Sequence, residues 1–217
     1  MPLGSRQSNG LYLKVVNSKI AQTVPEGTEG AVKRELQGGK RKGQPTWELM
    51  HDYVAGQIDG GEINSNEYGK TIHLHLKDSD GSKFIFQIPW NSSMRDQFSK
   101  RIPNIDVSKP LEINVFPDQK TEKPVLLLKQ ESSNIPFAFT RENPNGLPEW
   151  KRVKKMGEET IDKSEYDEFL YNLTVEFFEQ FDNGEKPTHQ EVASDEYEEE
   201  EKESSTGEDT LDEDVPF

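Results

Sequence analysis

Two histidines lie two residues apart in the segment KTIHLHLK (70–77). Side chains two apart in a β-strand point to the same face, so the rings of His73 and His75 would share that face with Lys77. Such a face could hold a metal ion or, with Lys83 on the next segment, line a groove for an anionic polymer. No third metal ligand has a matching position, so the sequence favours the groove over the metal site; an ordinary solvated surface fits these residues equally well.

Two further clusters combine aromatic rings with basic side chains, the composition of sites that bind single-stranded nucleic acids. One lies within residues 40–53 and one begins at Trp150; a lone tyrosine in a predicted loop is a further candidate. A single tryptophan is more often part of a core, but the four cations beside Trp150 are rarely buried, which favours an exposed site. The candidate residues are Lys40, Arg41, Lys42, Trp47, Tyr53, Tyr68, Trp150, Lys151, Arg152, Lys154 and Lys155.

The sequence contains no pattern typical of a catalytic centre. Its four histidines are scattered, and it lacks a P-loop, a dinucleotide-binding glycine motif and an HExxH sequence. The absence of cysteine excludes disulfides, thiolate zinc sites and cysteine nucleophiles together. We therefore expect a protein that is not an enzyme and that uses no cofactor and no metal ion.

Hydrophobic alternation predicts the strands that must position these residues. In the two central strands one face is apolar and is expected to be core: Ile72, Leu74, Leu76, Phe84, Phe86 and Ile88. Residues 60–69 predict a turn-rich loop, and residues 25–45 predict a long loop with room for a short helix at 31–36. The predicted strands are 10–24, 47–59, 70–77, 83–89, 110–116 and 124–130, with a further strand or extension at 135–140.

A short helix is predicted over 92–102, because Met94, Phe98 and Ile102 recur every four residues. Three meandering strands, a short helix and a two-stranded hairpin are the element order of an OB-fold. The expected fold is therefore mainly β: a five- to six-stranded OB-fold barrel with a short helix between its third and fourth strands. An apolar stripe through residues 166–181 predicts a C-terminal amphipathic helix. Other small barrels with one helix could be built from the same strands.

Charge divides the chain into parts. Residues 1–156 carry 23 basic and 18 acidic side chains, whereas residues 157–217 carry three and 23, within a net charge of −15. Hydrophobic residues are 31% of the chain, against about 45–50% in globular proteins, so part of it cannot be packed core. We expect an expression scar at 1–9, an OB-fold domain at 10–156, a helix within 157–185, a disordered acidic linker at 186–211 and a partner-binding tip at 212–217.

The last six residues are the most specific signal: Asp212, Glu213, Asp214, Val215, Pro216 and Phe217. Acids followed by an apolar residue, proline and a terminal phenylalanine closely resemble the C-terminal tip of bacterial single-stranded-DNA-binding proteins. The resemblance implies that the tip docks proteins of replication, recombination and repair. In such docking, Phe217 would fill an apolar pocket while its carboxylate meets a basic side chain. An acidic tail with no such role is the alternative.

The body of the chain differs from the bacterial family at residues 25–45, at the helix 163–182 and in its acidic linker, so no bacterial stacking residue carries over by position. An OB-fold body with an acidic tail that ends in an aromatic residue is more similar to the single-stranded-DNA-binding proteins of bacteriophages. That resemblance implies a protein of the host cytoplasm that coats single strands during DNA replication. The apolar stripe at 166–181 either packs on the barrel, which we favour, or makes a dimer contact, so we expect a monomer or homodimer. The alternatives are a protein-interaction adaptor with a DNA-mimic tail and an RNA-binding OB domain. No apolar run approaches the about 20 residues that span a bilayer, so we expect no membrane partner.

Overall fold

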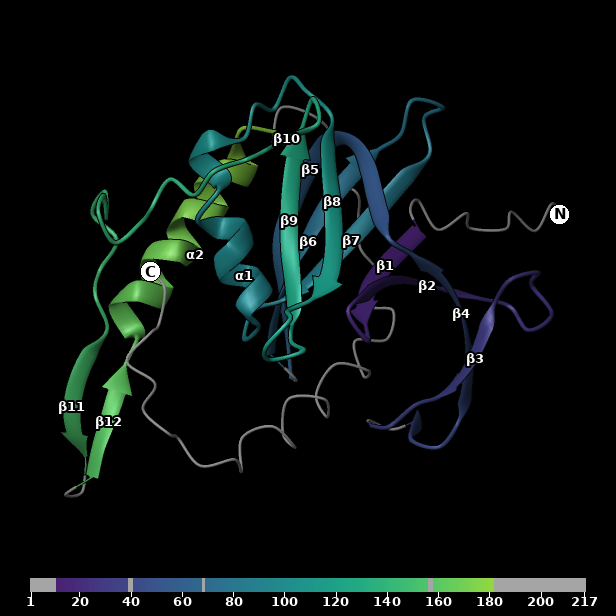
Figure 1. Ribbon diagram of the computed structural model, residues 1–217, viewed down its shortest axis with the longest axis horizontal. Coiled ribbons are helices and arrows are strands. Elements are labelled where there is room, and N and C mark those ends of the chain that lie inside the picture. Colours follow the sequence, from purple (N-terminus) through teal and green to yellow (C-terminus); the bar gives the residue numbers. More distant parts are fainter. Residues whose placement is uncertain (1–10, 39–40, 68, 156–157, 182–217) are drawn as a thin grey trace, which may run out of the picture.

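The computed structural model of the chain describes residues 11–38, 41–67, 69–155 and 158–181 (Figure 1). The expected expression scar at 1–9, the linker at 186–211 and the tip at 212–217 lie outside these residues, as do the candidate site residues Lys40 and Tyr68. In the described part of the chain, no helix is both long enough and apolar enough to cross a bilayer.

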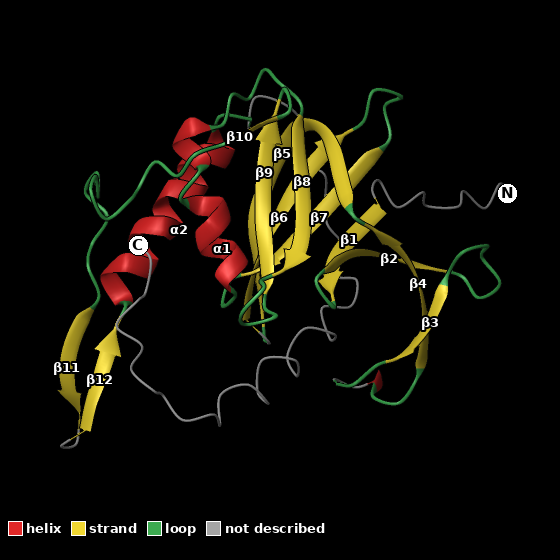
Figure 2. Cartoon of the chain, viewed as in Figure 1, coloured by secondary structure: helices red, strands yellow, loops and turns green. Residues whose placement is uncertain are grey.

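The described chain is mainly β (Figure 2). Ten strands form one sheet in the order β10-β9-β8-β5-β6-β7-β1-β2-β4-β3, and β11 pairs with β12 in a separate hairpin. Because this order has two ends, the large sheet is open, whereas the sequence predicted a barrel of five or six strands. The strands are β1 (Leu11–Val16), β2 (Lys19–Val24), β3 (Val32–Glu35), β4 (Pro45–His51), β5 (Tyr53–Asn66), β6 (Gly69–Lys77), β7 (Lys83–Pro89), β8 (Leu111–Pro117), β9 (Pro124–Gln130), β10 (Ser133–Asn134), β11 (Lys151–Lys155) and β12 (Glu158–Asp162), and the helices are α1 (Ser93–Ser99), the 3-10 turn η2 (Ile102–Asn104) and α2 (Ser164–Glu179).

The long strand β5 pairs with two neighbours in succession. Residues 53–56 pair with β8, and residues 57–66 pair with β6. A bulge between Ile58 and Gly60 shifts the register, and bulges bend and twist the strand that contains them. Gly56 permits close packing at the change of partner, because a Cβ there would lie 2.9 Å from the carbonyl oxygen of Lys77. The bend lets one strand join both halves of the sheet.

The core lies on the side of the sheet that carries the helices (Figure 2). The predicted apolar face of β6 and β7 points into it: Ile72, Leu74, Leu76, Phe86 and Ile88 are fully buried, and Phe84 packs against them. Helix α1 contributes Met94 and Phe98, and α2 contributes Phe177 and Phe178. The apolar stripe that the sequence placed at 166–181 therefore packs onto the sheet of its own chain.

Two predicted segments near the start of the chain were wrong. One strand was expected over 10–24, but residues 11–24 form the hairpin β1–β2, because Asn17 and Ser18 adopt left-handed φ angles of 48° and 56°. Two-residue turns of this kind match the twist of paired antiparallel strands. Residues 31–36, expected as loop or short helix, contain β3, which pairs with β4. The sequence VKRE shows no hydrophobic alternation, since β3 is an edge strand with largely exposed side chains.

Other boundaries also differ. The predicted strand 47–59 is two strands that meet at Asp52, and β5 continues through most of the predicted loop at 60–69. The glycines that suggested a loop there instead accommodate the bulge and the helix α2. Residues 135–140 form no strand, since β10 comprises only Ser133–Asn134. Within 157–185, the strand β12 precedes the helix.

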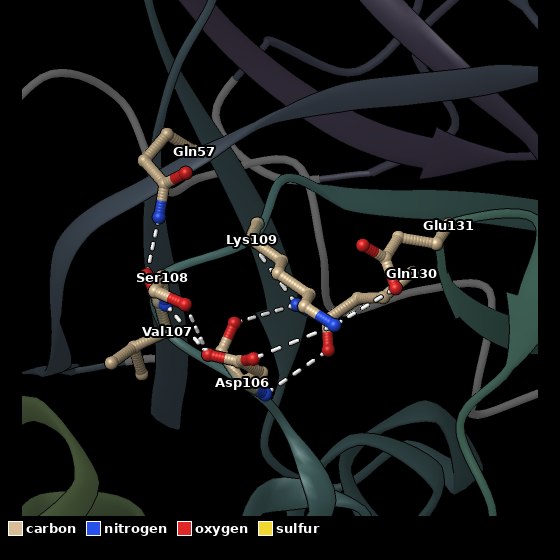
Figure 3. Close-up of polar contacts among 7 residues, drawn as sticks. All are labelled: Gln57, Asp106, Val107, Ser108, Lys109, Gln130 and Glu131. Carbon is tan, nitrogen blue, oxygen red and sulfur yellow. Dashed lines mark hydrogen bonds and ion pairs between the residues drawn. The ribbon is translucent and has the colours of Figure 1, made fainter.

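The loop after η2 is tied to the sheet by polar side chains (Figure 3). Gln57 of β5 donates a hydrogen bond to the carbonyl oxygen of Val107. The Gln130 side chain of β9 accepts a bond of 3.0 Å from the backbone N–H of Asp106 and donates one of 2.7 Å to its carbonyl oxygen. These side chains satisfy the backbone of an irregular segment, so we assign the loop a structural role.

We expect Gly61→Ala to destabilise the protein by about 1–3 kcal/mol through overpacking. A Cβ at Gly61 would collide with the ring of Phe178 and lie 2.7 Å from the carbonyl oxygen of His73. The urea midpoint of unfolding measures the loss. In a Phe178→Leu background the same substitution should cost less, because the obstructing ring is gone. An equal cost in both backgrounds would contradict this account of the packing.

Candidate nucleic-acid interface

Strands β1, β6 and β7 present polar side chains on the side of the sheet opposite the core. In register, His73 lies opposite Gln87, Lys77 opposite Lys83, and Tyr12 beside the buried Ile85. Residues two apart share a face, so these strands place the four predicted residues of β6 and β7 together. We call this set the polar face; it consists of Tyr12, Lys14, His73, His75, Lys77, Lys83 and Gln87.

His73 lies at the centre of the polar face and is 6% exposed. Its Nε2 is 3.2 Å from Nε2 of Gln87, and its Nδ1 is 3.6 Å from Oε1 of Glu62 on β5. The amide nitrogen of Gln87 can only donate, so Nε2 of His73 accepts this hydrogen bond. The proton of the neutral imidazole is then on Nδ1, which faces the Glu62 carboxylate. The ring of Tyr12 meets the imidazole edge-on, with 6.2 Å between centroids. Side chains from three strands therefore fix the His73 ring.

The accessible part of the polar face lies around His73. Tyr12 and His75 are half-buried, whereas Lys77 and Lys83 are exposed. Burial and, secondarily, the charge of the nearby Glu62 raise the pKa of Tyr12, so its hydroxyl is neutral at pH 7. Lys83 forms an ion pair of 2.8 Å with Asp59. The sequence treated His73 and His75 alike, but only His75 and the unpredicted Tyr12 offer accessible ring surface.

A buried ion group lies at the edge of the polar face and includes Lys14. Lys14 and Arg34 share the carboxylate of Glu48: Lys14 Nζ is 3.1 Å from Oε1, and Arg34 donates two bonds of 3.0 Å. Burial would raise the pKa of Glu48, but the Arg34 hydrogen bonds and the Lys14 charge outweigh it, so this pKa lies below its usual value. The ion group joins β1, β3 and β4.

Strands β3 and β4, with the described residues 36–38 and 41–44 between them, form an arm that extends away from the helices (Figure 1). Trp47 on β4 is half-buried, with Lys33 of β3 over its ring at 5.7 Å. Arg41 and Lys42 are exposed in the loop. The arm therefore gathers most of the predicted cluster at 40–53. Tyr53 lies outside it, at the start of β5 next to β8, and is 60% exposed.

The predicted cluster that begins at Trp150 is separate from the polar face. The hairpin β11–β12 lies beside α2, at the end of the molecule opposite the arm (Figure 1). The Trp150 ring meets Tyr166 edge-on at 5.8 Å, and Lys163 lies over it at 4.0 Å. Lys151 forms an ion pair with Glu165 of α2. Trp150 thus packs against α2. The remaining predicted residues of this cluster, Arg152, Lys154 and Lys155, lie on β11.

Sequence reasoning missed four residues of this region: Tyr12, Lys14, Arg34 and Gln87. The alternation in LYLKVV (11–16) separates Leu11 and Leu13 from Tyr12 and Lys14, so parity would have placed the latter two on a polar face. The role of Arg34 had no local signal, because its partner Glu48 follows 14 residues later on another strand.

Comparisons with protein-family models, with curated proteins and with solved structures found no match. Over the described ranges, no group of three or more histidine, aspartate or glutamate side chains is arranged to hold a metal ion.

Proposed function

We propose that this protein binds single-stranded DNA without sequence preference through its polar face. The observation that carries the proposal is the convergence of accessible rings and cations on three adjacent strands. Tyr12 and His75 would stack on bases, while Lys77 and Lys83 would contact phosphates. Neither kind of contact reads base edges, so binding is independent of sequence. The protein acts as a coat and not as an enzyme.

The topology of β5 to β9 supports an OB-fold as the finer description of this body. A meander β5-β6-β7, the helix α1 and a hairpin β8–β9 follow in the order of that fold, and β5 pairs with both β6 and β8. Such folds bind oligonucleotides across their second and third strands, which here are β6 and β7. Because β7 pairs with β1 on its other side, β1 extends the proposed site by Tyr12, whereas Lys14 is buried in its ion pair with Glu48.

The acidic C-terminal sequence supports a second part of the proposal. Residues 212–217 have the composition of a docking peptide, with acids, a proline and a terminal phenylalanine. Through them the protein recruits replication, recombination and repair enzymes to the coated strand, in the manner of bacteriophage single-stranded-DNA-binding proteins.

A fluorescence titration of the full chain tests the DNA-binding proposal. Because α2 supplies Phe177 and Phe178 to the core, the helix must stay in the protein. The ligands are labelled oligo-dT, a duplex and an RNA of equal length. Tight, salt-sensitive binding that prefers oligo-dT supports the proposal. A preference for RNA favours an RNA-binding domain, and no binding at low salt leaves a protein adaptor as the better description.

Truncation after Gly184 should tighten oligo-dT binding at low salt by about tenfold or more, because the acidic segment competes with DNA for the basic body. Residues 157–217 carry three basic and 23 acidic side chains, whereas residues 1–156 carry 23 basic and 18 acidic ones. Binding to about five phosphates would give a slope of log affinity against log salt near −3.5. An affinity that truncation leaves unchanged across the salt range would refute the competition.

A further inference from the structure

The hairpin β11–β12 separates charge between its two strands. The basic strand β11 carries Lys151, Arg152, Lys154 and Lys155, whereas the acidic strand β12 carries Glu158, Glu159 and Asp162. In register, Lys151 lies opposite Asp162 and Lys154 opposite Glu159. The hairpin is therefore close to neutral as a whole, but its two outer edges have opposite charge.

Neither outer edge of this hairpin pairs with another strand of the described chain, since β11 and β12 form a sheet of two strands. Sheets of two strands are marginally stable alone, and an open edge presents N–H and C=O groups to any further strand. The hairpin also exposes apolar surface, since Ile161 on β12 is 56% exposed. The hairpin lies at one end of the molecule (Figure 1).

We propose that the hairpin joins neighbouring copies of this chain, with β11 of one copy pairing with β12 of the next. Charge complementarity selects this arrangement. A two-fold symmetric dimer would place β11 beside β11 or β12 beside β12, and like charges directly opposite each other on paired strands are destabilising. Head-to-tail pairing instead matches the basic edge with the acidic edge, and such heterologous contacts extend without closing unless a ring forms.

A nucleic-acid strand is a poorer occupant of the same hairpin. Phosphates are attracted by an excess of positive charge, and the acids of β12 directly opposite Lys151 and Lys154 remove most of that excess. The pairing of copies does not depend on the proposed function. Its consequence on DNA does depend on the proposed function. Copies bound along one nucleic-acid strand would be held at high local concentration, so that a weak contact between them becomes effective.

Sedimentation velocity of the full chain without nucleic acid tests the pairing. The variants are Arg152→Glu on the basic strand and Thr160→Lys on the acidic strand. Arg152 lies opposite Ile161 and Thr160 opposite Val153, so neither substitution places like charges opposite each other within its own hairpin. Lys123→Glu, in the exposed loop between β8 and β9, is a control with a comparable change of charge.

The wild type should show a sedimentation coefficient that rises with concentration, and Lys123→Glu should behave alike. Each hairpin variant alone should associate about tenfold more weakly, because like charges then face each other across the interface. An equal mixture of the two variants should associate more strongly than either variant alone, because the β11 edge that one variant makes more acidic then faces the β12 edge that the other makes more basic.

Three results would overturn the proposal. The first is a wild type that stays monomeric up to about 1 mM, and the second is variants that associate as the wild type does. The third is a loss of oligo-dT affinity in Arg152→Glu, on an oligonucleotide too short for two copies, without a loss of association. That result would assign the hairpin to nucleic acid instead.

Discussion

Glu48→Ala is expected to destabilise the protein by about 3–5 kcal/mol, the usual cost of removing one partner from a buried ion group. Glu48 is fully buried, and its carboxylate holds Lys14 and Arg34 at 3.0–3.1 Å. Without it, two cations lose the counter-charge that offsets their burial. Guanidinium unfolding of the variant and the wild type, followed by tryptophan fluorescence, measures the difference.

Glu112→Ala is the matched control, because Glu112 also pairs with a lysine across neighbouring strands, at 3.4 Å, but both side chains are partly exposed. Exposed pairs contribute about 0–1 kcal/mol, so this variant should unfold near the wild type. If the two glutamate variants lose the same free energy of unfolding, burial does not make the Glu48 ion group more costly to break than an exposed pair, and the expectation is wrong.

The cost of Glu48→Ala should also depend on pH. The pKa of Glu48 in the folded protein lies below the ordinary value of 4.5, so folding favours the ionised carboxylate. Its contribution is complete above pH 4.5 and is lost as pH falls through the folded pKa. The stability difference between wild type and variant should therefore be constant near neutrality and shrink in acid. A difference that grows as pH falls would mean that Glu48 is protonated when folded.

The central strands could be predicted because their residues alternate in type. In KTIHLHLK (70–77) and KFIFQIP (83–89), every second side chain is apolar, and burial of one face dictates that pattern. The same alternation also places Tyr12, whether residues 10–24 are one strand or two, but the division of that segment into a hairpin could not be predicted. Its turn residues Asn17 and Ser18 are polar and not glycine, so the left-handed backbone that they adopt had no strong signal.

The parts that could not be predicted depend on partners distant in sequence. The edge of β7 that a closed barrel would use is paired with β1, about 70 residues earlier in the chain, and no local pattern encodes that choice. Likewise, Lys14, Arg34 and Glu48 come from three strands and form one ion group. The cluster that begins at Trp150 was grouped with the other basic clusters by composition alone, although the fold places it beside α2.

Tyr12→Ala should weaken oligo-dT binding by about 5- to 150-fold, since one base–aromatic stack contributes about 1–3 kcal/mol. The half-buried ring of Tyr12 on β1 meets the ring of His73 on β6 edge-on and forms part of the polar face. Tyr12→Phe keeps the ring and should bind within a few-fold of the wild type. A thermal melt of each variant verifies that the protein is folded at the titration temperature.

The dependence on salt separates stacking from phosphate contact. Tyr12→Ala removes no charge, so it should lower affinity equally at all salt concentrations. Lys77→Gln, on the same face and exposed, should instead reduce the slope of log affinity against log salt by about 0.7, the value for one phosphate of a single strand. A folded Tyr12→Ala variant with wild-type affinity, together with an unchanged slope in Lys77→Gln, would show that DNA does not use the polar face. Any DNA binding that is observed would then have to involve another surface, and the arm, where Arg41 and Lys42 are exposed, is the next candidate.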